Sequence, residues 1–275
     1  MRFYRQYQPG PQLSELVECY WVFRTSGDSC EVERLIPGGR VEMIFHFGSP
    51  FQLVTHPDSQ EGDQGTPVHF MGQRNRVYFG RPGGDADMLG VRFKPGGLAA
   101  FTTIPLTELL NRLIPADYVL GNVIKGWEDQ LFGLTEDRQR VLVLDRLLSG
   151  LLGKVAEDRA GLRPVLANIR KYPNDTAVQV ICEQTGWYYK KLERAFKEMV
   201  GYTPKQYCRI VRFNKAIRQM GHDRDASLTR VGYACGYYDQ SHFIKDFSLY
   251  AGTVPGSFPF VDHSMADYLI RHQPV

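Results

Sequence analysis

The sequence predicts an α+β protein: a β-rich amino-terminal domain, built as a sandwich or barrel, followed by an all-α carboxyl-terminal domain with two helix-turn-helix units. Three observations predict it. Glycine and proline are unevenly spread, the hydrophobic period changes from two to that of helices near residue 126, and a segment of about fifty residues is repeated. With 275 residues, the chain is long enough for two domains.

Glycine and proline mark the first part as β-rich. Residues 1–126 hold 16 of the 27 glycines and 10 of the 16 prolines, and these residues interrupt short apolar stretches. In RVEMIFHF the apolar side chains recur with a period of two, so one buried sheet face is expected to carry Val41, Met43, Phe45 and Phe47. Short strands of this kind favour a sandwich or a barrel.

The pattern becomes helical after residue 126. A helical linker is expected at 127–160, where it could act as a spacer or a dimer contact. The next boundary is expected at GLRP, because proline suits the first turn of a new helix. The predicted organisation is therefore a β-rich domain at 1–126, this linker, a helical domain at 161–262 and a tail at 263–275.

Composition excludes several classes of protein. The chain is 43% hydrophobic and 23% charged, the range of globular proteins, and no apolar run approaches the roughly 18 residues that a membrane-spanning helix needs. The start MRFYRQYQPG lacks the apolar stretch of a secretory signal, so a cytoplasmic protein without a membrane partner is expected. The five cysteines show no CxxC pair and predict buried or idle thiols; they are Cys19, Cys30, Cys182, Cys208 and Cys235.

The two halves of the chain differ in net charge. Residues 1–159 carry a net charge of −3, whereas residues 160–275 carry +6. Lysine and arginine gathered in one domain are typical of proteins that bind polyanions, although domains with other partners also reach such values.

An internal repeat is the strongest pattern in the sequence. AVQVICEQTGW at 177–187 aligns with SLTRVGYACGY at 227–237, and the match continues beyond the glycines with one residue added to the second copy. Each copy predicts a helix, a turn with glycine and a second helix, the arrangement in which the second helix can enter a DNA major groove.

The second helix of each copy has an apolar side and a polar side. In the first copy Leu192, Phe196 and Met199 form one stripe, while the opposite side is cationic. In the second copy the corresponding stripe is Phe243, Phe247 and Tyr250. Arginine can pair with guanine and glutamine with adenine, so these polar sides suit groove edges. A solvated basic face on an ordinary helical bundle gives a similar pattern and is the alternative.

A third helix is expected to join the two copies. The segment RIVRFNKAIRQM carries Arg209, Arg212, Lys215 and Arg218. These side chains add positive charge beside the repeat, or they are simply solvated.

The segment from about 163 to 260 resembles the DNA-binding domain of the AraC/XylS family of bacterial transcription regulators. The resemblance rests on GWYYKKLERAFKEMVGYTPKQY and ACGYYDQSHFIKDFSLYAGTVPGSF, which carry the family's G-(turn)-L-x-R-x-F and G-x-x-D-x-S-H-F patterns. It implies a transcription factor whose two recognition helices enter successive major-groove segments of double-stranded DNA. RNA polymerase and a second copy of the chain are left open as partners.

The resemblance also implies which side chains face DNA. The first recognition helix would present Lys190, Lys191, Glu193, Arg194 and Lys197, and the second would present Gln240, Ser241, His242, Ile244 and Lys245. We expect Arg194 to contact a base, with a phosphate contact as the alternative. Three residues depart from the family pattern: Tyr188 replaces a usual serine, Lys245 an arginine and Ser248 a lysine.

The amino-terminal half resembles a poorly defined domain found in a subset of these regulators. The match rests on ECYWVFR, LIPGGRVEMIFHFG and GVRFKPGGLAAF. It implies a β-rich regulatory domain that senses a small molecule, mediates dimerisation, or does both. RPGG and KPGG are interpreted as turns, and the aromatic residues of this half as core, with a ligand pocket among them as the alternative.

An enzyme is the alternative from another class, either a metal-dependent cupin or a DNA-repair methyl acceptor fused to the same DNA-binding unit. Cupin metal sites use an HxH pair, for which His46, His56 and His69 are too widely spaced. Only Cys19 and Cys30 precede residue 180, too few for a four-thiolate zinc site. No catalytic residue, metal ligand or cofactor is therefore predicted. A β domain that only dimerises and takes no ligand is the third interpretation.

Overall fold

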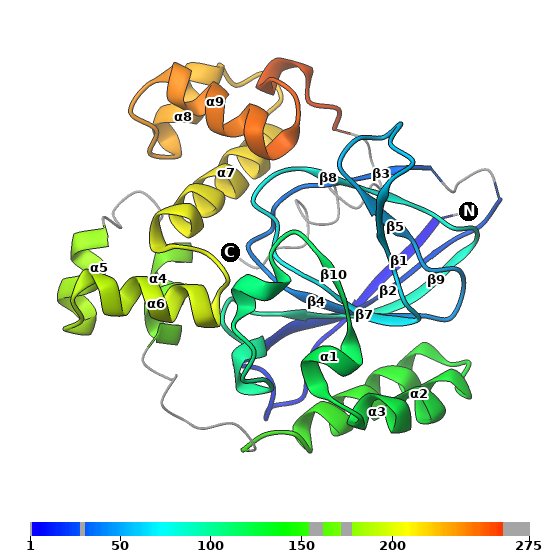
Figure 1. The fold of residues 1–275 in the computed structure, drawn as a ribbon. Helices are drawn as coiled ribbons and strands as arrows, with labels where there is room; N and C mark the ends of the chain where they lie inside the picture. Colours follow the sequence, from blue (N-terminus) through cyan, green and yellow to red (C-terminus); the bar gives the residue numbers. More distant parts are fainter. Residues whose placement is uncertain (1, 28–30, 154–161, 172–177, 261–275) are drawn as a thin grey trace.

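The computed structural model describes residues 2–27, 31–153, 162–171 and 178–260. Figure 1 shows a layered β domain with a helical domain beside it. The predicted α+β class, with a β-rich first part and a helical second part, is confirmed. The domain bounds stay a prediction.

Two antiparallel sheets form the β domain. The larger sheet runs in the order β1 (Arg2–Tyr7), β2 (Val17–Thr25), β9 (Ala86–Phe93), β4 (Glu42–His46), β7 (Val68–Met71) and β10 (Leu113–Pro115). The smaller sheet runs in the order β3 (Glu33–Leu35), β8 (Tyr78–Arg81), β5 (Gln52–Val54) and β6 (Gly62–Gln64). The described strands thus form two open sheets and no closed barrel, which favours the sandwich of the two predicted forms.

The central strand β4 is buried on both faces, which the alternating pattern did not predict. Met43 and Phe45 lie in a core on one side of the larger sheet, and Ile44 lies in a second core on the other side, between the sheets. Glu42 and His46 share the face of Ile44 and are buried too. The reason is that a layer covers each face, helices on one side and the smaller sheet on the other.

Three helices follow the sheets: α1 (Ala116–Leu120), α2 (Val123–Phe132) and α3 (Asp137–Ser149). The apolar side of α3 is buried through Val141, Leu144 and Leu148, which belong to the same core as the larger sheet. Two short turns of 3-10 helix, at Leu98–Ala100 and Leu106–Leu109, also contribute to this core.

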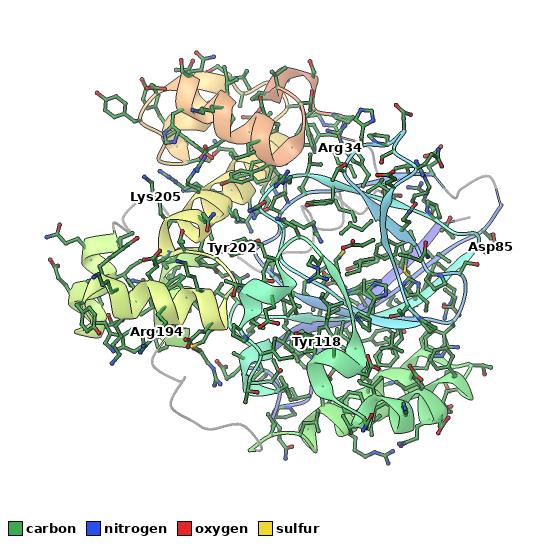
Figure 2. The ribbon with its side chains drawn as sticks, viewed as in Figure 1. Arg34, Asp85, Tyr118, Arg194, Tyr202 and Lys205 are labelled. Atoms are coloured by element: carbon green, nitrogen blue, oxygen red, sulfur yellow. The ribbon has the colours of Figure 1, made fainter. Side chains whose placement is uncertain are left out.

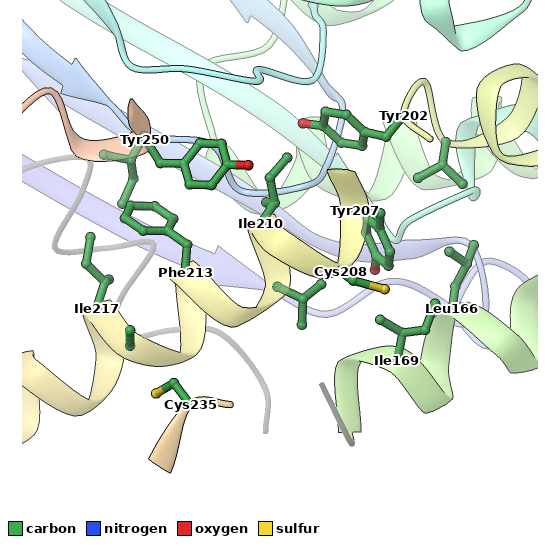
Figure 3. Packing of buried hydrophobic residues seen from close by; sticks show 14 of the residues in the cluster. Leu166, Ile169, Tyr202, Tyr207, Cys208, Ile210, Phe213, Ile217, Cys235 and Tyr250 are labelled. Carbon is green, nitrogen blue, oxygen red and sulfur yellow. The ribbon is translucent and has the colours of Figure 1, made fainter. Parts of the chain in front are cut away.

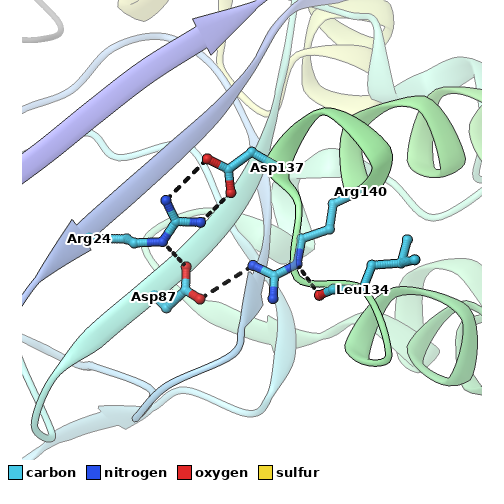
Figure 4. Close-up of polar contacts among 5 residues, drawn as sticks. All are labelled: Arg24, Asp87, Leu134, Asp137 and Arg140. Atoms are coloured by element: carbon cyan, nitrogen blue, oxygen red, sulfur yellow. Dashed lines mark hydrogen bonds and ion pairs between the residues drawn. The ribbon is translucent and has the colours of Figure 1, made fainter.

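Charged side chains fasten α3 to the sheet (Figure 4). Arg24 on β2 pairs with Asp137 at the start of α3 and with Asp87 on β9, at 2.9 Å from its Nε. Arg140 lies 3.3 Å from the other oxygen of Asp87 and donates from its Nε to the carbonyl of Leu134 at 2.8 Å. Part of the segment predicted as a linker is therefore anchored on the β domain.

The described part of the carboxyl-terminal domain contains six helices: α4 (Leu162–Lys171), α5 (Val178–Thr185), α6 (Tyr189–Met199), α7 (Pro204–His222), α8 (Leu228–Ala234) and α9 (Gln240–Ala251). A 3-10 turn at Pro255–Ser257 follows them. The long helix α7 runs between two helical pairs, α5 with α6 and α8 with α9 (Figure 1). Its inner side carries Tyr207, Ile210, Phe213 and Ile217, which pack with side chains of α4 and α9 in one core (Figure 3).

The two domains share a polar and apolar interface. Tyr202 donates its hydroxyl to the carbonyl of Arg74 at 2.7 Å, and Asn214 on α7 donates to the carbonyl of Pro37 at 3.1 Å. Ile36 from the β domain lies within the core of the helical domain. Figure 2 shows Arg34 on the β domain beside the second helical pair.

Most of the cysteines that the structure describes are buried. Cys19, Cys208 and Cys235 are buried free thiols, Cys182 is half-buried, and Cys30 lies outside the described residues. Burial raises the pKa of Cys19 to about 12 and that of Cys208 to about 11, so both thiols stay protonated and unreactive at neutral pH. This agrees with the prediction of idle thiols for these residues.

Candidate nucleic-acid interface

The two repeated segments fold as two matching helical pairs. The first pair is α5 and α6 and the second is α8 and α9. Each pair turns at a glycine in the left-handed region, Gly186 with φ 66° and Gly236 with φ 80°. A glycine of the same kind ends each second helix, Gly201 with φ 79° and Gly252 with φ 71°. Glycine adopts this region without strain, which explains why the repeat keeps glycine at these four places.

The first recognition helix, α6, has one buried side and one exposed side. Leu192, Phe196 and Met199 are buried in the domain core. Lys190, Lys191, Arg194 and Lys197 are exposed, and Glu193 is half-buried. Figure 2 shows Arg194 reaching away from the domain. The apolar side thus fixes the orientation of the helix and leaves its cations for a partner.

Two of the cations on α6 have acidic neighbours one turn away. Lys197 Nζ lies 3.0 Å from Glu193 Oε1, and Arg194 Nε lies 4.0 Å from Glu198 Oε1. Exposed pairs of this spacing contribute only a few tenths of a kcal/mol, so a phosphate or base edge can displace them. Glu193 therefore has an intrahelical partner in Lys197.

The start of α6 differs from the usual helix cap. Tyr188 occupies the N-cap and its side chain accepts no hydrogen bond. The ammonium group of Lys191 lies 4.6 Å above the ring of Trp187. The first turn therefore keeps backbone N–H groups free of a side-chain cap, and such groups bind anions at helix N-termini.

The second recognition helix, α9, begins with a conventional cap. Asp239 accepts a hydrogen bond from the backbone N–H of His242 at 2.6 Å. Gln240, Ser241 and Lys245 are exposed, and Ile244 is half-buried. Gln240 also accepts from the hydroxyl of Thr229 at 3.3 Å, so its amide is partly held in place.

His242 is less available than the other side chains of α9. It is half-buried, its ring lies edge-on to Tyr237 at 5.5 Å, and its Nε2 lies 3.8 Å from Asp246. The contacts of His242 in the structure are packing contacts with its own helical pair. A contact between His242 and DNA stays a prediction.

Helix α7 holds the second pair with two of its arginines. Arg209 forms two hydrogen bonds with Asp246, at 3.2 and 2.5 Å, and Arg212 donates to the carbonyl of Gly236 at 3.1 Å. Asp246 is completely buried. These arginines, expected to add positive charge or to be solvated, instead fix the turn and the middle of α9. Sequence reasoning missed Asp246, although an acid on the apolar side of a recognition helix is a visible sign of a buried pair.

Exposed tyrosines flank both recognition helices and were also missed as candidates. Tyr188 is 69% exposed and Tyr238 is 88% exposed, and each lies in the turn before a recognition helix. Tyr189 and Tyr233 are exposed as well. Large exposed rings of this kind indicate a contact surface. The run of aromatic residues after each turn glycine was the signal that could have identified Tyr188, Tyr189 and Tyr238.

The described residues contain no helix that could cross a membrane. Within the same ranges, no three histidine, cysteine or acidic side chains gather as a metal site requires. His46 and His69, too far apart in sequence for an HxH pair, are nevertheless brought together on neighbouring strands, with ring centroids 4.9 Å apart. Burial first, and for His46 the neighbouring ring second, lowers the pKa of His46 to about 3, while burial lowers that of His69 to about 4.

Comparison with known proteins matches both halves of the chain. Residues 181–259 match the family described as a helix-turn-helix domain, and residues 5–115 match a domain of unknown function (DUF6597). The chain is 30% identical over 105 residues to the HTH-type transcriptional activator RhaS of Salmonella schwarzengrund, and RhaS of Salmonella arizonae matches equally. The match covers 38% of this chain and 37% of RhaS, so the chain aligns with little more than a third of the length of these relatives.

Two solved structures align with most of the chain at low TM-scores. ToxT from Vibrio cholerae has a TM-score of 0.45 at 11% identity, and the match covers 86% of this chain and 96% of ToxT. The AraC-like transcriptional activator CuxR has a TM-score of 0.26 at 16% identity, covering 86% of this chain and 100% of CuxR. The matched segment and the RhaS relatives show that residues 181–259 are a helix-turn-helix domain of the kind found in AraC/XylS regulators.

Proposed function

We propose that this protein is a sequence-specific DNA-binding regulator of transcription. The observation that carries the proposal is the pair of matching helix-turn-helix units, each with a recognition helix that buries its apolar side and exposes polar or cationic side chains. A bound duplex would meet α6 and α9 in successive segments of its major groove. The protein would act in the cytoplasm, with the DNA.

The ten candidate side chains divide by what they offer. Exposed lysines supply phosphate contacts, whose strength falls as salt rises. Arg194 is the foremost base contact, because its fork can pair with guanine. Gln240 and Ile244 suit adenine and a thymine methyl group. The exposed tyrosines in the turns would add contacts to the sugar-phosphate backbone.

The β domain would be the regulatory part of the protein. In this proposal it senses a small molecule, mediates dimerisation, or does both, and no catalysed reaction is part of it. RNA polymerase and a second copy of the chain remain proposed partners. Support comes from the interface described above, since the β domain contacts α7 through Pro37 and the end of α9 through Arg34. An event in the β domain can therefore reach both helical pairs.

Replacing Arg194 with alanine tests the proposed site. We expect Arg194→Ala to weaken binding to a selected operator by about 1–3 kcal/mol and to narrow its advantage over random DNA, because a base contact is lost. Arg138→Ala is the matched control, since Arg138 is an exposed arginine on α3, away from both recognition helices. Titrations at one fixed salt concentration measure the affinity of each variant for the operator and for random DNA, and their quotient is the specificity ratio. An unchanged specificity ratio for Arg194→Ala would refute its role in reading bases.

A further inference from the structure

One histidine lies on a recognition helix. His242 is the third residue of α9, and the amino-terminal residues of a recognition helix are those that meet the bases. Histidine is the residue type whose ordinary titration falls between about pH 5 and 8, whereas lysine, arginine and glutamate keep their charge over most of that range. Among the ten candidate DNA-facing side chains, His242 is therefore the one whose charge follows the pH. Its side chain is 40% exposed, so part of the ring is open to a partner.

Packing within the second helical pair fixes the ring. Its Nε2 lies 3.8 Å from an oxygen of Asp246, one turn further along α9, and the ring lies edge-on to Tyr237 with centroids 5.5 Å apart. The backbone N–H of His242 donates to the cap residue Asp239 at 2.6 Å. A separation of 3.8 Å is too long for a hydrogen bond, so Asp246 faces the ring without bonding to it.

The negative charge of Asp246 is already matched. Arg209 on α7 donates to both of its oxygens, at 3.2 and 2.5 Å, and Asp246 is completely buried. A proton on His242 would therefore stand beside an ion pair with no net charge. A single acid cannot balance two cations, so the counter-charge for a protonated His242 has to come from outside this pair.

The other ionisable groups on the elements around His242 do not supply this counter-charge. Asp239 is a second acid, but its carboxylate caps α9. Burial raises the pKa of Tyr237 well above its ordinary value, so this phenol stays neutral. The further neighbours on α7, α8, the turn and α9 are cations or exposed phenols: Arg212, Arg230, Tyr233, Tyr238 and Lys245. Cations thus outnumber acids around the ring.

A DNA duplex would supply the missing negative charge, because its phosphates form a dense line of charge. Among the candidate contacts of α9 the exposed cation is Lys245, whereas α6 offers four cations. A protonated histidine donates from both ring nitrogens and a neutral one from a single nitrogen. Charging His242 would therefore give α9 a second cation and a further donor. Because coupling between two ligands is reciprocal, a proton that strengthens DNA binding is itself bound more tightly in the complex.

We propose that DNA binding takes up a proton at His242, so that this protein binds its site more tightly as the pH falls from about 8 to about 6. The proposal rests on the function proposed above, and it makes the second helix-turn-helix unit the pH-dependent one. The first unit keeps its charge across this range, because its cations are lysines and an arginine.

Titrations of a duplex selected by the full-length chain test this proposal at one fixed salt concentration. We expect the duplex to bind about three- to tenfold more tightly at about pH 6 than at about pH 8. His242→Gln should remove this gain, because glutamine keeps a polar side chain that binds no proton. His222→Gln and His56→Gln are the matched controls, since both histidines are exposed, one at the end of α7 and one in the β domain. A gain that persists in His242→Gln, or that disappears in either control, would overturn the assignment to His242.

Calorimetry counts the proton directly. Binding heats measured near neutral pH in two buffers with different ionisation enthalpies give the number of protons taken up per duplex bound. The unaltered chain and both controls should take up a fraction of one proton more than His242→Gln. Equal uptake by all four proteins would overturn the proposal. Circular dichroism at each pH verifies that the proteins are folded, because the lowered pKa values of the buried His46 and His69 weaken the fold as the pH falls.

The same titrations separate failure of this proposal from failure of the proposed function. Equal affinity of the unaltered chain for the selected duplex at both pH values would overturn the proton uptake and leave the proposed function standing. Binding of no duplex at either pH would refute the proposed function, and this proposal with it.

Discussion

At the scale of single residues, the buried His46 and His69 show what a linear pattern misses. They stand 23 positions apart, and their spacing in the sequence argued against an HxH metal pair. The antiparallel pairing of β4 with β7 places them side by side, with Phe51 against both rings. Both side chains are almost fully buried, so the folded protein keeps them neutral.

This burial predicts a pH dependence of stability. The pKa values of His46 and His69 are lowered to about 3 and about 4, below the usual value of 6.5. As the pH falls below about 6.5, the unfolded chain binds protons that the folded chain excludes. Stability is therefore complete above that pH, and each histidine removes about 1.4 kcal/mol per pH unit on the way down. Urea unfolding at several pH values between 7 and 5 measures the slope.

His46→Phe should give a shallower slope than the unaltered chain, because one of the two titrating groups is gone. His56→Phe is the control, since the side chain of His56 is 69% exposed and should leave the slope unchanged. A slope that is the same in all three proteins would contradict the account of the buried pair.

At the scale of elements, the repeat was readable because glycine is needed where the backbone takes positive φ. The four matched glycines all lie at such places, and this made two helix-turn-helix units predictable from one sequence. The orientation of the units was not predictable in the same way. It depends on Arg209 pairing with Asp246, 37 residues further along the chain, and no local pattern shows that contact.

Substituting two of these glycines should destabilise the protein by different amounts. Gly186→Ala should destabilise the protein by about 1–2 kcal/mol through backbone strain alone, because nothing lies within 4 Å of the added carbon. Gly201→Ala should cost clearly more, since its added carbon would also collide with Gln73 and the carbonyl of Leu106 in the β domain. Urea unfolding compares them. Equal losses would mean that the β domain does not press against this turn.

At the scale of the whole molecule, the two domains are joined by contacts between residues far apart in sequence. The carboxylate of Glu18 lies 2.7 Å from Arg40 within the β domain and 3.7 Å from Arg170 on α4. Glu18 and Arg40 are both buried, so each needs the charge of the other. The sequence predicted both kinds of domain from periodicity and punctuation. The interface between the domains could not be predicted from the sequence, because an interface depends on which distant side chains meet.

Removing the charge of Glu18 tests the buried Glu18–Arg40 pair, which lies beside Arg170 of α4. Glu18→Gln leaves Arg40 buried without a carboxylate, and we expect a loss of about 3–5 kcal/mol in the free energy of unfolding. Glu15→Gln is the control, since Glu15 is exposed a few residues earlier in the chain. Chemical unfolding of the full chain measures both. A loss no larger than that of the control would show that the buried Glu18–Arg40 pair is not needed for the stability of the protein.

The most direct measurement is an unbiased selection of duplex oligonucleotides by the full-length chain at one fixed salt concentration. The account predicts enrichment of a site with two parts whose centres lie about 10 base pairs apart, one helical turn, because α6 and α9 would read successive major-groove segments. Arg194→Ala should lose preference in one part only. Selection that enriches no sequence above the random pool would contradict the proposal that this protein is a regulator that reads DNA.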